Sequence, residues 1–404
     1  MPVKILKTFR FRVYPDAAQI ARLGRWNDAL RFLWNLANEQ RLMGLARPKG
    51  ERIYPRDSDQ RKELKDLRAA LPWLADVPQD VCSRLLVVLD FAWRRCFRKI
   101  SRAPRWKKMG RDYLSFCEPH PKKWRIDGSN IRFPKIGTLR AVLHRPLEGK
   151  PKTCTLHRDG DQWFAIIFCE IELTDPAPRD GPVVAIDRGL ANFGGTSDGE
   201  MIASPHHLQV SLKKLARAQR IVSRRKTGSN NREKAKIRVS RIHRKVRRQR
   251  NQFLHVQSAR FAKSHGVVVL EKLNVAGMIR SKLARSIADA GWSRFADFLR
   301  YKLAWSGGTL VEVPAEYSSQ TCSACGCVDA ESRRSQAVFY CTSCGYQDHA
   351  DLNAAKVLLT RANRSGLPVD GSACKGPGRS RKRAGLRVPR RPSEGSTAVE
   401  LITS

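Results

Sequence analysis

Residues 182–187 read PVVAID. The four consecutive apolar residues in this stretch, rich in β-branched side chains, predict a buried strand. The strand ends in Asp187, a carboxylate that is costly to bury unless a cation meets it. A tight turn and a second predicted strand, residues 192–197, follow directly. We therefore expect a sheet that begins here, with an acid at the end of its first strand.

Two further acids stand in comparable places. Residues 266–271 read GVVVLE, a second predicted buried strand that ends in Glu271, and Asp351 opens the predicted helix 352–359. Three bare carboxylates cannot crowd together, because like charges raise one another's pKa values. They can crowd around Mg²⁺ or Mn²⁺, which prefer oxygen ligands, and two such ions can clamp both oxygens of a phosphodiester displacement. The alternative is that each acid merely caps its element or faces solvent.

The charge of the chain indicates a polyanionic partner. Its 404 residues include 77 Lys and Arg against 37 Asp and Glu, a net charge of +40. Nucleic acid is the obvious partner, although ribosomal and DNA-compacting proteins share this property and are not enzymes. No apolar segment is typical of a signal peptide or long enough to span a bilayer. We expect no membrane association and a cytoplasmic, prokaryotic protein that lies on the nucleoid when bound to DNA.

The amino-terminal half is expected to combine a small β-barrel with a helical lobe. Strand signals occur at 8–14 and then at six places between 113 and 173, with turns at Asp127–Gly128 and Asp159–Gly160. Helical patterns lie between them. We expect a barrel of residues 1–15 and 104–175, interrupted by a helical lobe of residues 16–103. The aromatic residues of the helices are better explained by core packing than by base stacking.

The carboxy-terminal half is expected to be an α/β domain, which makes the whole chain an α+β multidomain protein. Its order of three strands, helices, strand, helix, strand and helix is that of the ribonuclease-H-like fold. In that fold the first and fourth strands are neighbours, so Asp187 and Glu271 would meet and the last helix would bring Asp351 to them. We assign residues 182–314 and 348–364 to this domain.

A strongly basic segment separates the first two acids. Residues 213–250 contain 17 Lys and Arg and one acid, Glu233, with helix breakers at 228–230 that predict a helical hairpin. A solvated helix face normally carries both signs of charge, so this stretch would repel itself unless a phosphate backbone neutralised it. The candidate nucleic-acid contacts are Lys213, Lys214, Arg217, Arg220, Arg224, Arg225, Arg241, Arg244, Lys245, Arg247 and Arg248.

Four cysteines have the spacing of a zinc ribbon. Cys322 and Cys325 form one C-x₂-C pair, and Cys341 and Cys344 form another. Four thiolates complete a tetrahedral shell with no open position, so the zinc would be structural. Cys327 is a rival ligand that lacks the two-residue gap. We expect a ribbon of residues 315–347 that holds the loop before Asp351.

Several of these stretches resemble the TnpB family of transposon-encoded, RNA-guided DNA nucleases, which are related to compact type V CRISPR effectors. The motifs are AIDRGL at 185–190, LEKLN at 270–274, SQTCSACG at 319–326 and DLNAA at 351–355. The resemblance implies a RuvC-type catalytic triad of Asp187, Glu271 and Asp351 with two Mg²⁺ or Mn²⁺. Two departures stand out: Arg188 replaces a residue that is uncharged in many relatives, and Asp348–His349–Ala350 replaces a common acid–Arg pair.

The expected function follows from this resemblance. A structured, transposon-end guide RNA would select double-stranded DNA by base pairing, while the wedge-like barrel and helical lobe would read a short flanking motif. The alternatives are an unguided transposase or resolvase with the same nuclease fold, and a repressor that binds nucleic acid without cutting it. The tail 365–404 is rich in Gly, Pro, Ser and Arg and is expected to be disordered.

Overall fold

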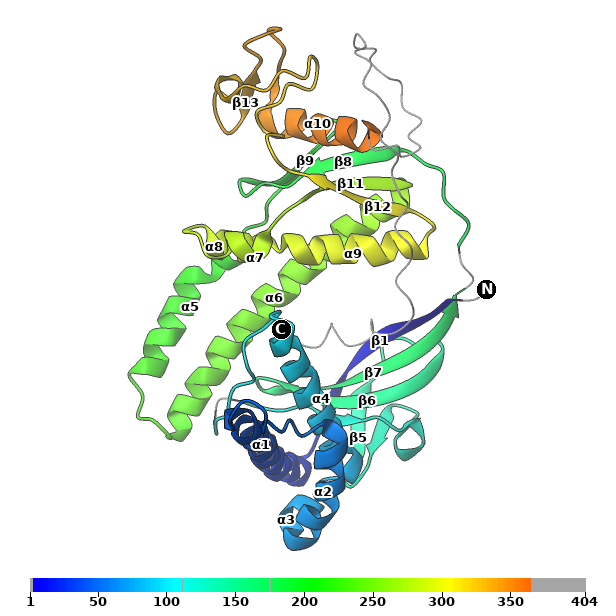
Figure 1. Cartoon of the computed structure of the whole chain (residues 1–404), viewed down its shortest axis with the longest axis vertical. Coiled ribbons are helices and arrows are strands. Elements are labelled where there is room, and N and C mark those ends of the chain that lie inside the picture. The colour runs from blue at the N-terminus through cyan, green and yellow to red at the C-terminus, as the bar shows by residue number, and fades with distance from the viewer. Residues whose placement is uncertain (1–2, 111, 174–175, 365–404) are drawn as a thin grey trace. The chain divides into compact units, whose positions relative to one another are not determined.

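The computed structural model describes residues 3–110, 112–173 and 176–364, which form two compact units divided at residues 174 and 175 (Figure 1). The tail 365–404, for which disorder was predicted, lies outside the described residues. Within them, no helix has both the length and the apolarity needed to cross a bilayer.

The first unit contains four α-helices and seven strands within its described residues. Its elements are β1 Val3–Tyr14, α1 Ala17–Ala46, α2 Asp57–Ala70, α3 Pro72–Ala75, α4 Gln79–Phe97, β2 Phe116–Glu118, a 3₁₀ turn Pro121–Lys123, β3 Arg125–Asp127, β4 Asn130–Phe133, β5 Gly137–Val142, β6 Lys150–Asp159 and β7 Gln162–Leu173. The strands form one antiparallel sheet in the order β2-β6-β7-β1-β5-β4-β3. The small barrel that was predicted is a half-barrel, since the edge strands β2 and β3 are only three residues long and do not pair with each other.

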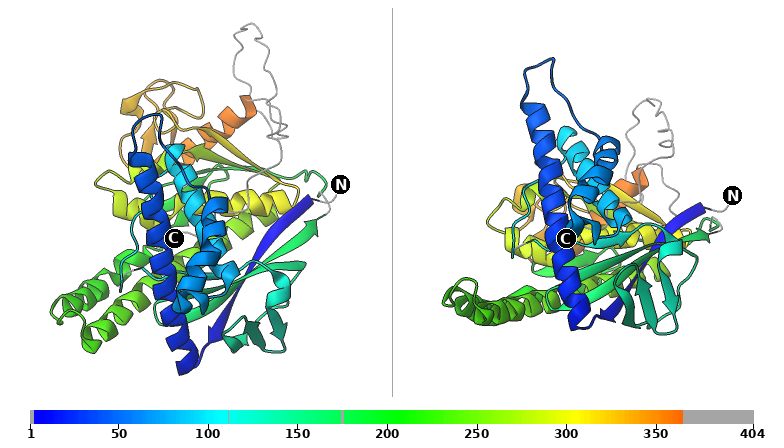
Figure 2. Two further views of the ribbon diagram at one scale, coloured as in Figure 1. Left: turned by 60° about the horizontal axis from the view of Figure 1, so that its bottom comes forward. Right: turned by 90° about the horizontal axis from the view of Figure 1, so that it is seen from below.

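The helices of this unit begin and end where local chemistry dictates. Asp16 and Gln19 form a reciprocal capping box at the start of α1, with the Gln19 N–H 2.8 Å from the Asp16 carboxylate. Helices α2 and α3 are separate rather than continuous, because Pro72 lacks the N–H that a continuous helix needs. Figure 2 shows α1, α2 and α4 grouped together. Their apolar faces share one core with the sheet, which includes Phe9 and Trp26.

The second unit is built on a five-stranded sheet. Its elements are β8 Val183–Asp187, β9 Asn192–Thr196, β10 Met201–Ala203, α5 His207–Ser223, α6 Asn230–Ser264, β11 Val267–Lys272, α7 Val275–Met278, α8 Ala284–Ala290, α9 Trp292–Trp305, β12 Thr309–Pro314, a 3₁₀ turn Ala330–Ser332, β13 Val338–Tyr340, β14 Gln347–His349 and α10 Ala350–Arg364. The sheet order is β10-β9-β8-β11-β12. The first and fourth strands of the unit, β8 and β11, are parallel neighbours, as predicted.

Both faces of this sheet are covered, which explains the uninterrupted apolar runs in its central strands. Val184 and Ile186 of β8 point into a core shared with α6 and α9, where Leu254 and Phe295 are fully buried. The alternate residue Ala185 points to the opposite face and packs in a separate core with residues of α10. The sheet is therefore a central layer with helices on both sides, as Figure 1 shows.

The basic hairpin and the cysteine segment are the two long excursions from this sheet. Helices α5 and α6 pack side by side, and Ser229 caps the start of α6, where the breaker was predicted. The carboxy-terminal part of α6 lies on the sheet with α9, while its amino-terminal part extends beyond the sheet with α5 (Figure 1). The cysteine segment carries the small hairpin β13–β14 and leads directly into α10.

Candidate functional site

The register of two parallel strands brings the first two acids together. Ile186 of β8 lies opposite Leu270 of β11, and the next residue on each strand is an acid, Asp187 and Glu271. Asp187 is the last residue of β8, whereas β11 continues one residue further, to Lys272. The two carboxylates therefore stand at the carboxyl edge of the sheet on adjacent strands, where open α/β sheets bind their ligands.

Glycine lets the third acid reach the same edge. Asp351 is the second residue of α10, which packs on β8 and β9. Gly195 of β9 lies opposite Asp187, and a Cβ added to Gly195 would lie 3.0 Å from the carbonyl carbon of Asp351. A larger residue at 195 would push α10 away, so this glycine is required for the close approach of Asp351 to the strand that carries Asp187.

The segment before Asp351 has a structural role. The Tyr346 hydroxyl donates to Asp348 at 2.9 Å, and Lys356 pairs with the same carboxylate at 2.8 Å. The main-chain N–H of Asp351 donates to Nδ1 of His349 at 3.2 Å. Asp348 and His349 are therefore engaged in anchoring the start of α10.

The electrostatics of the three acids are those of a crowded anionic site. Loss of hydration raises the pKa of Asp187 well above its ordinary value, and the charges of Glu271 and Asp351 raise it further. Burial also raises the pKa of Glu271, against which the neighbouring Arg188 acts. These three side chains therefore interact with one another, and each would be more stable as a carboxylate if a cation lay between them.

Two arginines partly compensate these charges. Arg188 is buried, with Nε 3.6 Å from Oε1 of Glu271 and Nη1 3.4 Å from the carbonyl oxygen of Trp292. Its second terminal nitrogen also donates to the main-chain oxygen of Glu271. Arg333, at the end of the 3₁₀ turn of the cysteine segment, has Nη2 3.6 Å from Oδ1 of Asp351. Sequence reasoning noted Arg188 only as a departure from the family and missed Arg333, because no local pattern reports a contact across a loop.

The donor set at the sheet edge fits a hard divalent cation. Carboxylate oxygens are the ligands that Mg²⁺ and Mn²⁺ prefer, and the mutual repulsion at Asp187 is what such a cation would relieve. The spacing of the three acids is wider than that of a closed cage, since among the described residues only the four cysteines have ligand atoms all within 4.8 Å of one another.

The four predicted zinc cysteines lie together. Their sulfur atoms are within 4.8 Å of one another, including 3.7 Å for Cys322 and Cys344 and 3.6 Å for Cys325 and Cys341. Cys327, the rival ligand, is not part of this group. Four sulfur donors at this spacing fit a tetrahedral zinc ion with no open position.

Two matching turns build the cysteine group. The N–H of Gly326 donates to the Cys322 carbonyl oxygen at 2.9 Å, and the N–H of Gly345 donates to that of Cys341 at 3.0 Å. Both glycines have positive φ, 79° and 72°, which a residue with a side chain rarely adopts. Each C-x₂-C-G stretch therefore folds into the same tight knuckle.

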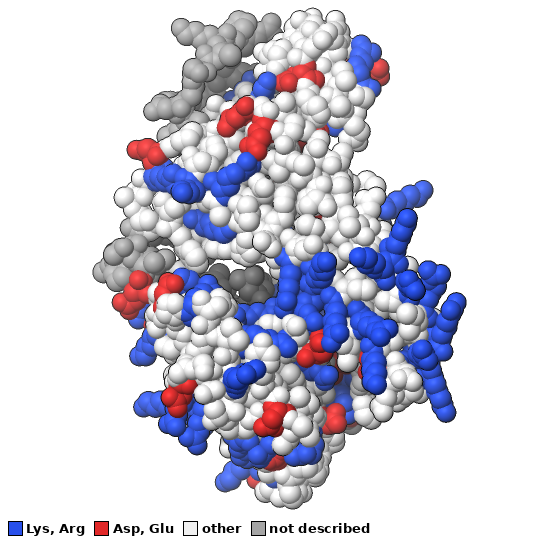
Figure 3. Space-filling view, turned by 180° about the vertical axis from the view of Figure 1, so that it is seen from behind, with Lys and Arg blue, Asp and Glu red and all other residues white. Residues whose placement is uncertain are grey.

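The basic hairpin presents most of its predicted nucleic-acid contacts to solvent. Figure 3, in which this hairpin is the arm at the right, shows Lys and Arg side chains crowded over it. The exposed candidates are Lys213, Lys214, Arg217, Arg220, Arg224, Arg225, Arg241, Lys245 and Arg248. Arg247 is half-buried. Arg244 is only 6% exposed, so it is the least accessible of the eleven candidates.

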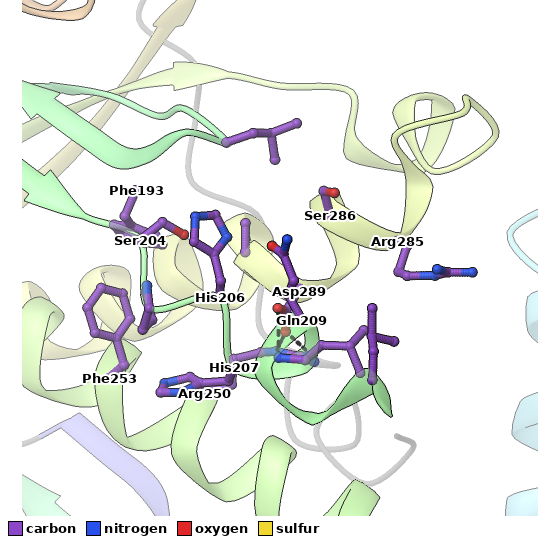
Figure 4. Close-up of a pocket in the computed structure, with 15 residues that line it drawn as sticks. Phe193, Ser204, His206, His207, Gln209, Arg250, Phe253, Arg285, Ser286 and Asp289 are labelled. Carbon is purple, nitrogen blue, oxygen red and sulfur yellow. Dashed lines mark hydrogen bonds and ion pairs between the residues drawn. The ribbon is translucent and has the colours of Figure 1, made fainter. Parts of the chain in front are cut away.

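A hollow of about 290 Å³ lies at the base of this hairpin (Figure 4). Asp289 of α8 accepts the Leu208 N–H at 3.0 Å, capping α5, and pairs with Arg250 of α6 at 2.6 Å. One carboxylate thus ties both arms of the hairpin to the helix that precedes α9. Sequence reasoning missed this link, since Asp289 lies far from both partners along the chain.

Comparisons with known proteins agree with this architecture. A family model described as "Probable transposase" matches residues 166–282, and one described as "Cas12f1-like, TNB domain" matches residues 292–358. A third, described as "Helix-turn-helix domain", matches residues 1–42, where the structure has a strand and the first part of one long helix. Together these matches cover most of the second unit and the start of the first.

Two bacterial relatives match along almost their whole length. "Putative RNA-guided DNA endonuclease InsQ" of Escherichia coli is 32% identical over 88% of this chain and 92% of its own. "Putative RNA-guided DNA endonuclease" of Streptomyces pristinaespiralis is 33% identical over 92% of this chain and 93% of its own. The protein in the cryo-EM structure of a Cas12f1–sgRNA–target DNA complex shares the fold, with a TM-score of 0.53, 14% identity and coverage of 88% and 98%. By its sequence motifs and these full-length relatives, the chain belongs to the TnpB family.

Proposed function

We propose that this protein is an RNA-guided DNA endonuclease whose RuvC-like site consists of Asp187, Glu271 and Asp351. The observation that carries the proposal is the convergence of these acids: adjacent parallel strands present two of them, and α10 carries the third over Gly195. The full-length relatives, both named as RNA-guided DNA endonucleases, support the assignment of guided DNA cleavage.

The residues of the site divide the work of hydrolysis. Asp187, Glu271 and Asp351 would hold two Mg²⁺ or Mn²⁺ ions, which when bound supply Lewis-acid activation of water and of the phosphodiester. Arg188 holds the Glu271 carboxylate against the end of β11, and the chain at Gly195 keeps α10 close. The four cysteines would hold a structural zinc, and the ribbon would then fix the loop that enters α10.

The remaining surfaces would handle the nucleic acids. The exposed Lys and Arg residues of α5 and α6 would bind the guide RNA through its phosphates, and base pairing would select the DNA strand. The half-barrel of strands β1–β7 and the helices α1–α4 would read a short DNA motif beside the target.

Guide-programmed cleavage of a plasmid tests this proposal. The protein would be purified with its copurifying RNA, the guide portion of that RNA replaced, and cutting followed with Mg²⁺. Cutting that follows the new guide sequence supports the proposal. Cutting that ignores the guide favours an unguided transposase or resolvase, and guided binding without cutting favours a repressor.

A further inference from the structure

Five cations line one hollow at the edge of the half-barrel. The hollow, of about 560 Å³, lies against β3, β4 and the turns beside them. Its charged lining consists of Lys122, Lys123, Arg125, Arg132 and Lys135, and no Asp or Glu is among its lining residues. All five side chains belong to exposed residues. A concave surface with this single sign of charge attracts an anion.

The pairing of β3 with β4 places two of these cations directly opposite each other. Arg125 and Arg132 are cross-strand partners. Like charges in this position destabilise an antiparallel pair, which normally carries opposite charges or apolar residues there. Neither guanidinium forms an ion pair or hydrogen bond with a described residue, whereas Lys123 pairs with Asp80 and Lys135 donates to the Ala75 carbonyl oxygen at 2.8 Å. The two arginines therefore lack an anionic partner within the described part of the unit.

A buried donor in the same lining also lacks a partner. Trp124 is only 5% exposed, and its indole N–H forms no hydrogen bond with the described residues. Leaving such a donor unpaired in a folded protein is costly, and nearly all buried polar groups avoid it. The backbone beside it is also unusual, since Lys135 has φ of 58°, a conformation that residues with side chains rarely adopt. Repulsion, an orphan donor and an unfavourable backbone conformation thus coincide at one hollow.

We infer that this hollow is a binding site for a phosphate group of a nucleic-acid backbone. A phosphodiester between Arg125 and Arg132 would turn their repulsion into two charge-assisted contacts. The two cross-strand guanidiniums act as a clamp, and Lys122 extends the positive lining. The inference rests on the proposed function only for the presence of guide RNA and target DNA, which are the two sources of such a phosphate.

Two variants and their controls test the clamp. The double variant Arg125→Gln/Arg132→Gln removes both charges, and Arg125→Lys/Arg132→Lys keeps them. Binding of the full chain to its copurified, relabelled RNA and to a labelled DNA duplex would be measured across a range of salt concentrations, without divalent metal. The Gln variant should lower the log–log salt slope by about 0.7–0.9 for each phosphate that it no longer neutralises, and the Lys variant should retain the wild-type slope. Trp124→Phe removes a buried donor but no charge, so it is a control that should retain the wild-type binding and salt slope.

Thermal unfolding of the free protein gives the second readout. Relief of the Arg125–Arg132 repulsion should raise the melting temperature of the Gln variant above that of the wild type, while its binding becomes weaker. A slope change with RNA alone assigns the phosphate to the guide, and one with the duplex alone assigns it to DNA. Wild-type slopes with both probes, or a lower melting temperature with unaltered binding, would overturn the inference. Absence of guided cleavage by the wild type would contradict the proposed function, whereas the clamp is judged on the salt slopes and the melting temperatures.

Discussion

The main-chain N–H of Arg188 donates to Oε1 of Glu271 at 3.2 Å, and Nε of the same arginine lies 3.6 Å from that oxygen. Both side chains are almost fully buried, with 3% and 8% exposure. Removing one partner of a buried pair leaves the other charge uncompensated, which typically costs about 3–5 kcal/mol. Arg188→Met should therefore lower the unfolding free energy of the metal-free protein by about that amount in urea titrations.

An exposed arginine supplies the control for this prediction. Arg300 pairs with Asp297 and Glu312 at the surface, where its side chain is 53% exposed. Arg300→Met should cost about 1 kcal/mol or less. Glu271→Gln added to Arg188→Met should recover part of the loss, because the buried carboxylate is then neutral. Equal effects of the Arg188 and Arg300 variants would contradict the role given to Arg188.

The raised pKa of Asp187 predicts how stability varies with pH. The ordinary pKa of this carboxyl is 3.8, and between that pH and its raised native pKa the native state keeps a proton that the unfolded state has lost. Stability therefore falls as the pH rises between these two pKa values. The raised pKa of Glu271 acts in the same direction. In chelator, the melting temperature of Asp187→Asn should therefore exceed that of the wild type by an amount that grows as the pH rises above about 4.

Two other acids affect stability in a different pH range. The pKa values of Asp76 and Asp348 are lowered, so their contributions to stability are lost only as the pH falls below about 4. They do not overlap with the effect expected of Asp187. If the melting temperatures of the wild type and Asp187→Asn differed by the same amount at every pH above about 4, the pKa of Asp187 would not be raised. Added Mg²⁺ should bring the two profiles closer together.

The cysteine group predicts one structural zinc per chain. Cys325→Ala removes a sulfur of the group, while Cys327→Ser changes a neighbour whose sulfur is outside it. Metal analysis should find about one zinc in the wild type and in Cys327→Ser, and much less in Cys325→Ala, with a lower melting temperature for the latter. Zinc retained by Cys325→Ala but absent from Cys327→Ser would exchange the ligand assignments.

The exposed face of α6 predicts salt-dependent RNA binding. Arg241, Lys245 and Arg248 lie on this face, whereas Arg244 is buried. Replacing the three exposed residues with Gln should reduce the log–log salt slope by about 0.7–0.9 for each RNA phosphate that is no longer neutralised. The control variant Arg241→Lys/Lys245→Arg/Arg248→Lys conserves the charge and should leave the salt slope unchanged. A slope that is the same in all three proteins would exclude this face from backbone binding.

The sheet and its acids could be predicted from the sequence because their signals are local. Apolar runs mark β8 and β11, and parallel neighbours necessarily present Asp187 and Glu271 at one edge. The burial of Arg244 could not be predicted, because the apolar residues of this stretch, such as Ala235 and Val246, recur on the other side of the helix. The sequence also could not tell a half-barrel from a closed one, since turn signals identify hairpins but not whether edge strands meet.

The exposure of individual side chains and the contacts between distant residues could not be predicted from the sequence. Ile20, Val88 and Phe97 have helical spacing with buried residues, yet they are 45%, 41% and 50% exposed, because the apolar stripe is wider than the surface that covers it. Arg333 and Asp289 act through partners distant in the chain. Such contacts depend on how loops are folded, and residue spacing carries no record of them.

The central claim is that Asp187, Glu271 and Asp351 act as one metal-dependent site. Asp187→Ala, Glu271→Ala and Asp351→Ala should each abolish cleavage, and combining them should add little, because groups that act as a unit are not additive. Asp198→Asn, which changes an exposed acid in the turn after β9, is the matched control and should cut normally.

The most direct measurement is guide-programmed cleavage of a plasmid by these proteins, run beside a gel shift on the same target. The wild type and Asp198→Asn should cut with Mg²⁺ or Mn²⁺ and fail in chelator, while Ca²⁺ should support binding better than cutting. Each triad variant should bind the target and leave it intact. Efficient, guide-dependent cutting by Asp187→Ala would contradict the account.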